Sequence, residues 1–169
     1  YITQYCSGGR YCTTARYYLA DSYYRLGKNS EALAQYAILA EMNANPYQEE
    51  AATRVAEICY DKGDFSCALE GFYRLQALAS GRENTLIARL GILRCSQALG
   101  RHQAVIDVAD MILGDKPISD DMRIEALYGR AKAYIGLNEW KNAQPDLTTL
   151  SKEVRTAQGA EAKYLLAQS

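Results

Sequence analysis

Small, apolar and aromatic positions recur along this chain with the spacing of amphipathic helices. Between residues 11 and 26 they fall one, three or four positions apart, at Tyr11, Ala15, Tyr18, Leu19, Ser22, Tyr23 and Leu26. Such spacing places side chains on one face of a helix. A second helix, capped by Ser30, is predicted to bury Leu33, Tyr36, Ala37, Leu39 and Ala40. No stretch alternates polar and apolar residues for long enough to predict a strand, so the chain is predicted to be all-α.

The predicted helices pair around a recurring turn residue. Segments around Gly27, Gly63 and Asn138 superimpose on one another, and a fourth segment around Gly100 fits less well. These residues stand 36, 37 and 38 positions apart (27 to 63, 63 to 100 and 100 to 138). A fixed period of this length predicts stacked helix hairpins, each packing on the next. Gly27 is expected to supply the left-handed turn that ends the first helix.

Hairpins are predicted at residues 11–46, 48–81, 83–117 and 119–156, with a partial unit at 157–169. After the first hairpin, the predicted helices cover about 48–62, 65–79, 83–99, 102–113, 120–136 and 140–153. Pro46 and Pro117 fall between helices, and Pro145 is expected near the start of one, where a missing N–H costs little. Residues 1–169 are expected to form a single solenoid. Neither end has a polar capping repeat, which indicates a fragment of a longer array.

Pairs of alanines are expected where the two helices of a hairpin meet. The predicted pairs are Ala20 with Ala32, Ala56 with Ala68, and Ala131 with Ala143. Side chains this short let two helices approach closely. Leu93 and Val105 replace this pair in the third hairpin, which predicts either a splayed helix pair or a shifted register.

Taken together, these motifs resemble the tetratricopeptide repeat family over essentially the whole chain. The shared features are Gly at the turn, an aromatic residue soon after it (Phe65 and Trp140), a small residue in each helix, and Pro46 at the end of a unit. The resemblance implies a right-handed α-solenoid of about four repeats with partial repeats at both ends. It also implies a scaffold that binds proteins and is not an enzyme.

Two segments, residues 15–24 and 159–167, are also similar to bacterial cell-envelope members of that family. These members include the periplasmic proteins that accompany Tol–Pal and the outer-membrane assembly machinery. This similarity favours a periplasmic location, with the cytoplasm as the alternative.

The resemblance places the first helix of each hairpin on the concave side of the solenoid. It implies a groove that binds a protein or peptide segment through Tyr17, Tyr18, Asp21, Tyr24, Arg25, Arg54, Glu57, Tyr60, Asp61, Arg94, Tyr128 and Lys132. Leu90, Gln97 and Tyr164 continue this line. The chain has 14 Tyr against 1 Trp and 2 Phe, and Tyr combines a large contact area with a hydrogen-bonding tip. The alternative interpretation is that many of these Tyr side chains only pack the hairpins.

Some members of the family hold a peptide's terminal carboxylate with paired Lys and Asn side chains. Here Tyr17, Asp21 and Arg54 stand at the matching places, so this mode of binding is not supported. A second hypothesis is structural: the chain is a spacer within a larger envelope-associated protein, or it self-associates through its uncapped ends. Exposed apolar faces expected near Leu165 and Leu166 motivate that hypothesis.

Other classes of function find little support. The formal net charge is −1, whereas binding to nucleic acid needs a basic surface. No apolar run approaches the roughly 20 residues that cross a bilayer. His102 is the only histidine and is expected to be solvated, so no catalytic centre, metal site or cofactor is predicted. Gly8-Gly9-Arg10 lacks the Lys-Ser/Thr ending of a phosphate loop and is interpreted as a turn. Glu49, Glu50, Asp120 and Asp121 are expected to complement helix dipoles.

The five cysteines cannot all pair with one another. None belongs to a C-x-x-C motif, which argues against a zinc site. Cys59 and Cys95 are interpreted as small core residues. Cys6 and Cys12 flank a Gly-Gly turn and could form a disulfide in an oxidising compartment.

Overall fold

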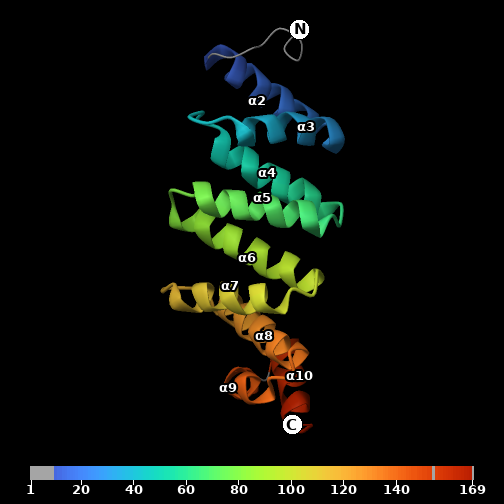
Figure 1. Ribbon diagram of the computed structural model, residues 1–169, viewed down its shortest axis with the longest axis vertical. Helices are drawn as coiled ribbons and strands as arrows, with labels where there is room; N and C mark the ends of the chain where they lie inside the picture. Colours follow the sequence, from blue (N-terminus) through green and yellow to red (C-terminus); the bar gives the residue numbers. More distant parts are fainter. Residues whose placement is uncertain (1–9, 154, 169) are drawn as a thin grey trace. The chain divides into compact units, whose positions relative to one another are not determined.

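The structure is a computed structural model that describes residues 10–153 and 155–168 (Figure 1). This part of the chain folds into α-helices and contains no strand, which confirms the predicted all-α repeat fold. The helices are α2 (Arg10–Arg25), α3 (Asn29–Glu41), α4 (Gln48–Asp61), α5 (Phe65–Leu78), α6 (Arg82–Ala98), α7 (His102–Gly114), α8 (Asp120–Gly136), α9 (Trp140–Leu150) and α10 (Ala157–Leu166).

Two compact units divide the chain, the first ending at Ala88 and the second beginning at Arg89, both within α6. In the first unit α2 packs on α3, α3 on α4 and α4 on α5; in the second unit α7 packs on α8, α8 on α9 and α9 on α10. Packing between neighbours in sequence, without one shared centre, is characteristic of helix repeats. The extension of one solenoid over residues 1–169 stays a prediction.

Every predicted hairpin turn has the same backbone conformation. Gly27, Gly63, Gly100 and Asn138 all adopt the left-handed region, with φ between 61° and 76°. At Gly63 the turn is closed by two bonds, Asp64 N–H to the Cys59 carbonyl (3.0 Å) and Gly63 N–H to the Tyr60 carbonyl (2.9 Å). The equivalent bonds recur at the other three turns. This is the Schellman motif, which satisfies the last carbonyls of the first helix and fixes where the second begins.

The predicted alanine pairs are fully buried. Ala20, Ala32, Ala56, Ala68, Ala131 and Ala143 each have 0 % exposure. Gly71 of α5 lies so close to α4 that a Cβ on it would come within 2.9 Å of the Ala56 Cα. Leu93 and Val105, which replace the pair in the third hairpin, are buried as well. Small residues therefore allow the close approach of α4 and α5, here through Ala56 and Gly71, while the pairing of Ala56 with Ala68 stays a prediction.

Several local predictions were wrong. Ser30 does not cap α3, because the helix already begins at Asn29 and no side chain caps it. At α8 the cap is Ser119, whose hydroxyl accepts a hydrogen bond from the Met122 N–H. Pro145 lies in the second turn of α9. Only in the first turn do backbone N–H groups lack a partner within the helix, so the missing N–H of Pro145 does remove a helical hydrogen bond. The predicted face of the first helix also fails in part, because Tyr11, Tyr18 and Leu26 are exposed.

The C-terminal helix is better packed than predicted. Leu165 and Leu166 were expected to be exposed, but they are half-buried against a core cluster that includes Leu147, Leu150 and Ala162. Tyr164 is the large exposed residue of α10, with 63 % of its surface accessible.

A disulfide links the two helices of the second hairpin. Cys59 on α4 and Cys67 on α5 are bonded, with their Cα atoms 5.7 Å apart. Cys59 is buried as predicted, but its pairing was missed. Cys95 is a free, buried thiol whose pKa is raised to about 11 by burial. Cys12 also takes part in a disulfide. The Cys6–Cys12 prediction and the Gly8-Gly9 turn concern residues outside the described part of the chain.

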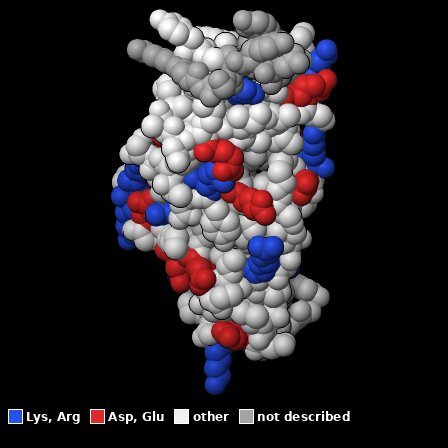
Figure 2. Space-filling view, turned by 45° about the horizontal axis from the view of Figure 1, so that its top comes forward, with Lys and Arg blue, Asp and Glu red and all other residues white. Residues whose placement is uncertain are grey.

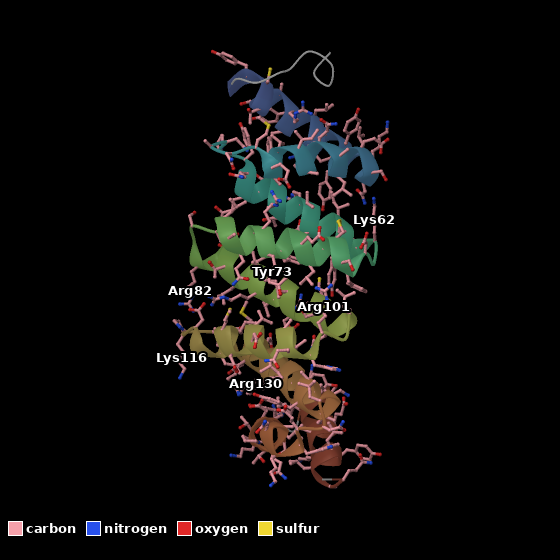
Figure 3. All side chains as sticks on the ribbon, viewed as in Figure 1. Lys62, Tyr73, Arg82, Arg101, Lys116 and Arg130 are labelled. Atoms are coloured by element: carbon pink, nitrogen blue, oxygen red, sulfur yellow. A yellow bond between two sulfur atoms is a disulfide. The ribbon has the colours of Figure 1, made fainter. Side chains whose placement is uncertain are left out.

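A buried ion pair joins the helices of the fourth hairpin. Arg130 of α8, labelled in Figure 3, donates to both carboxylate oxygens of Asp146 on α9, at 2.8 and 2.7 Å. It also bonds to Asp110 of α7. The Asp146 side chain is only 6 % exposed, and its hydrogen bond raises the pKa of Arg130. Removing one partner of such a pair strands a buried charge, which typically costs about 3–5 kcal/mol.

Replacing Cys59 and Cys67 together by Ala is expected to lower the free energy of unfolding by about 2–3 kcal/mol, because the disulfide closes a short loop in the unfolded chain. Urea denaturation of both proteins without reductant measures this difference. Addition of reductant to the double variant then isolates the contribution of the Cys12 disulfide. Equal unfolding free energies for the two oxidised proteins would contradict the prediction.

Candidate functional site

The twelve residues predicted to form a binding groove all lie on the first helices of the hairpins. Five are on α2 and four on α4, in the first unit; Arg94 on α6 and Tyr128 and Lys132 on α8 are in the second. Each is exposed or half-buried, and none belongs to the buried core. The structure therefore brings together the α2 and α4 residues as one set, and the α6 and α8 residues as another.

In the first unit, Tyr17 is the centre of the set, which we call the α2–α4 surface. Its ring stacks on Tyr47 with centroids 4.2 Å apart, and its hydroxyl donates to Glu50 Oε1 at 2.8 Å. Burial and this hydrogen bond raise the pKa of Tyr17 above its ordinary value. The buried ring of Tyr36, on α3, lies edge-on with its centroid 6.4 Å away. Tyr17 is thus held in place before any partner arrives.

Charged side chains of the α2–α4 surface are also held in place. The Arg54 guanidinium lies over the Tyr24 ring, 5.1 Å from its centroid, and pairs with Glu57 at 2.8 Å. Arg25 pairs with Asp21 at 2.8 Å. Among the other predicted residues, Tyr60 packs edge-on against Phe65, whereas Tyr18 and Asp61 are exposed.

In the second unit, the same bond type recurs with the same spacing. Tyr128 stands ten residues before Asn138, as Tyr17 stands ten before Gly27, and its hydroxyl donates to Glu161 Oε2 of α10 at 2.6 Å. Both bonds span 33 residues, from one first helix to the next. Lys132 bonds to Glu161 as well, at 2.9 Å. These two hydrogen bonds, from Tyr128 first, lower the pKa of Glu161.

The position six residues before each turn carries a charge that is already paired. Asp21 pairs with Arg25 and Glu57 with Arg54; Arg94 makes a two-pronged bond to Glu125 at 2.6 and 2.8 Å, and Lys132 pairs with Glu161. Figure 2 shows blue and red side chains intermingled on one face of the molecule, often in contact. These four charges of the predicted groove are therefore satisfied by internal partners.

A cleft, which we call the α8 cleft, follows α8 on both sides of Tyr128. One hollow of about 430 Å³ is lined by Gln97, Tyr128, Asp121, Ile124, Glu125, Thr156 and Gln158. A second hollow of about 230 Å³ shares Gln97 and Tyr128 and is completed by His102, Val105, Gly129, Lys132 and Ala133. A Cβ on Gly129 would come within 2.6 Å of the Gln97 Nε2, so glycine lets Gln97 lie directly against α8.

Sequence reasoning missed several residues of these surfaces. Tyr47, Glu125 and Glu161 were not considered, and Glu50 was interpreted only as a dipole partner. Glu49, its neighbour, accepts hydrogen bonds from Asn84 and Ser80. A signal existed for Glu50 and Glu161, because each follows a first-helix Tyr by 33 residues.

His102 differs from the prediction of a solvated side chain. It is half-buried, and a Cβ on Gly136 would approach its ring within 2.5 Å. Within residues 10–153 and 155–168, no group of three or more His, Cys, Asp or Glu could hold a metal ion. In the same ranges, no helix has the length and apolarity that a membrane span requires.

Comparisons with known proteins support the repeat assignment. Residues 14–45 match the family model of the tetratricopeptide repeat. One similar solved structure is described as nearly identical TPR-like repeats of a kinesin light chain from Podosopora anserina. It is 20% identical, covers 91% of this chain and 82% of its own, and superposes with a TM-score of 0.57. No curated protein matches the chain.

Replacing Tyr128 by Phe is expected to make the protein less sensitive to alkaline pH. Burial and the bond to Glu161 raise the pKa of Tyr128 to about 12, whereas an unfolded Tyr titrates near 10. The folded state therefore holds this proton more tightly, and the resulting stability is complete below about pH 10 and lost as pH rises towards 12. Urea unfolding of both proteins at pH 8 to 12 measures the effect, with Tyr18→Phe as control. A stability difference that does not shrink above pH 10 would contradict it.

These comparisons identify the fold. Tetratricopeptide repeats are protein–protein interaction modules and are typically non-catalytic scaffolds. The first hairpin of this chain is matched by the family's repeat model over residues 14–45, and the helix hairpins share their fold with the TPR-like repeats of the solved structure.

Proposed function

We propose that the first-helix surfaces of this chain bind a segment of a partner protein, in an extended or helical conformation. The observation that supports this most directly is the ordered, accessible set of aromatic side chains on α2 and α4. Tyr18 is 60 % exposed on α2, and Tyr24 and Tyr60, each three residues before its hairpin turn, are half-buried. Tyr is enriched among the residues that dominate binding energy at interfaces.

The hydrogen bonds and ion pairs within the α2–α4 surface lower the entropy cost of binding a partner. Ordering a mobile side chain at an interface costs about 0.5–1.5 kcal/mol. Tyr17, fixed by Glu50 and Tyr47, and Arg54, fixed by Glu57 and Tyr24, have already lost that freedom. A partner therefore meets a pre-organised surface and retains more of its contact energy.

The second hypothesis was self-association through the ends, and it was motivated by apolar faces expected to be exposed near Leu165 and Leu166. These two side chains instead pack against the core of the fourth hairpin. Partner binding is therefore the function that the described residues support better.

Replacing Tyr18, Tyr24 and Tyr60 together by Ala is expected to reduce partner capture at least about thirtyfold, as loss of interface hot spots does. The immobilised chain is incubated with extract of its source cells, and bound proteins are quantified by mass spectrometry. A control variant replaces Tyr11 and Tyr73, which are exposed outside the predicted groove. Circular dichroism verifies that both variants stay helical. Equal capture by the two variants would rule the α2–α4 surface out.

We also propose that the protein works in an oxidising compartment such as the bacterial envelope. The Cys59–Cys67 disulfide and the disulfide at Cys12 support this, because reducing cytosol keeps thiols free. Alkylation in intact cells, followed by mass spectrometry, is expected to leave Cys59 and Cys67 unmodified until a reductant is added. Direct alkylation of both thiols in the cell would place the protein in a reducing compartment.

A further inference from the structure

The charged residues that line the α8 cleft indicate which kind of ligand it can bind. Three of its lining residues, Asp121, Glu125 and Lys132, have carboxylate or ammonium groups. Glu125 is bonded to Arg94, and Lys132 is bonded to Glu161. Asp121 is exposed in the first turn of α8 and has no hydrogen bond or ion pair among the described residues. The uncompensated charge in the larger hollow is therefore negative.

The smaller hollow has a different character. Its floor is formed by Val105, Ala133 and Gly129, all buried, together with the ring of Tyr128. The Lys132 ammonium is drawn to Glu161, and it lies 5.9 Å from the centroid of the Tyr128 ring. The Gln97 amide lies directly against Gly129, and His102 completes the lining, so the hollow combines an apolar base with polar groups at its side. A single apolar side chain of a ligand suits such a hollow.

We propose that the α8 cleft binds an extended, cationic segment of a partner protein. A Lys or Arg side chain of this segment pairs with Asp121, and an apolar side chain enters the smaller hollow, against Val105 and Ala133. This inference rests on the proposed function and gives it a ligand chemistry. The side-chain amides of Gln97 and Gln158 lie along the larger hollow and can both donate to and accept from the peptide backbone.

The geometry of α8 sets the spacing of the two ligand residues. Asp121 and Gly129 are eight helical residues apart, which is about 12 Å at 1.5 Å per residue. An extended chain advances about 3.3 Å per residue, so the cationic and apolar residues stand about four positions apart. Residues four apart in an extended chain point to the same side, as this arrangement requires.

The charge of the cleft also selects against acidic segments. A ligand carboxylate near Asp121 and Glu125 meets two like charges, of which only Glu125 is compensated by Arg94. Ion pairs at an exposed rim add little affinity but strongly influence which partners are accepted. The apolar residue therefore supplies most of the affinity, and Asp121 supplies the selection for a cation.

The test uses a synthetic peptide with blocked ends, Gly-Lys-Ser-Ala-Ser-Leu-Gly, and isothermal titration calorimetry with the full chain. Asp121→Asn is expected to weaken binding about threefold to fivefold, the range of an exposed ion pair. Asp120→Asn is the matched control, since Asp120 lies in the same turn and pairs with Arg123 outside the cleft. Replacing the peptide Leu by Ala is expected to weaken binding about tenfold.

A double-mutant cycle identifies the ion pair. Changing the peptide Lys to Gln should weaken binding to the wild-type chain but not to Asp121→Asn, because the interaction is already absent there. A peptide with Lys directly before Leu should bind more weakly than the original.

Three results would overturn the inference: no binding at millimolar peptide, equal effects of Asp121→Asn and Asp120→Asn, or equally strong binding of a peptide with Glu in place of Lys. Any of these can occur while Tyr18, Tyr24 and Tyr60 still govern partner capture. In that case the proposed function stands and only this ligand chemistry falls. Loss of the capture effect alone would reject the proposed function without affecting the peptide result.

Discussion

A single left-handed residue at each hairpin turn is the constraint on which the rest of the structure depends. Once the Schellman bonds close at Gly63 or Asn138, the second helix runs back along the first, and side chains of the two helices meet across the hairpin. Cys59 and Cys67 lie four residues on either side of Gly63 and form a disulfide. Arg130 and Asp146 lie eight residues on either side of Asn138 and form an ion pair.

This symmetry explains why much of the fold could be predicted and why its strongest contacts were missed. The turn residues and alanine pairs are predictable because only small or left-handed-tolerant residues fit those positions. The disulfide and the ion pair join residue types that also occur elsewhere, so composition alone does not single them out. Counting outward from Gly63 and Asn138 would have found both pairs. The capping of α3 and the place of Pro145 depend on where each helix begins, which the hydrophobic pattern fixes only within a few residues.

The proposed binding surfaces could be located only in part from the sequence. The period of the turns was sufficient to place Tyr17 and Tyr128 on accessible first helices. It did not reveal that Glu50 and Glu161 hold their hydroxyls, because such a bond depends on two successive repeats together. The α8 cleft could not be predicted from the sequence. It requires Gly129, whose missing side chain admits Gln97 from another helix, and that contact is set by tertiary packing.

The internal ion pairs of the first helices also influence how the protein responds to its solvent. An incoming charge at Asp21, Glu57, Arg94 or Lys132 must replace a neighbour that is tethered to the same chain. Added electrolyte weakens the incoming contact and the tethered one alike, so the two effects largely cancel. Under the proposed function, recognition at these four positions is expected to be nearly indifferent to ionic strength, and the fit of the aromatic rings then decides which partners are retained.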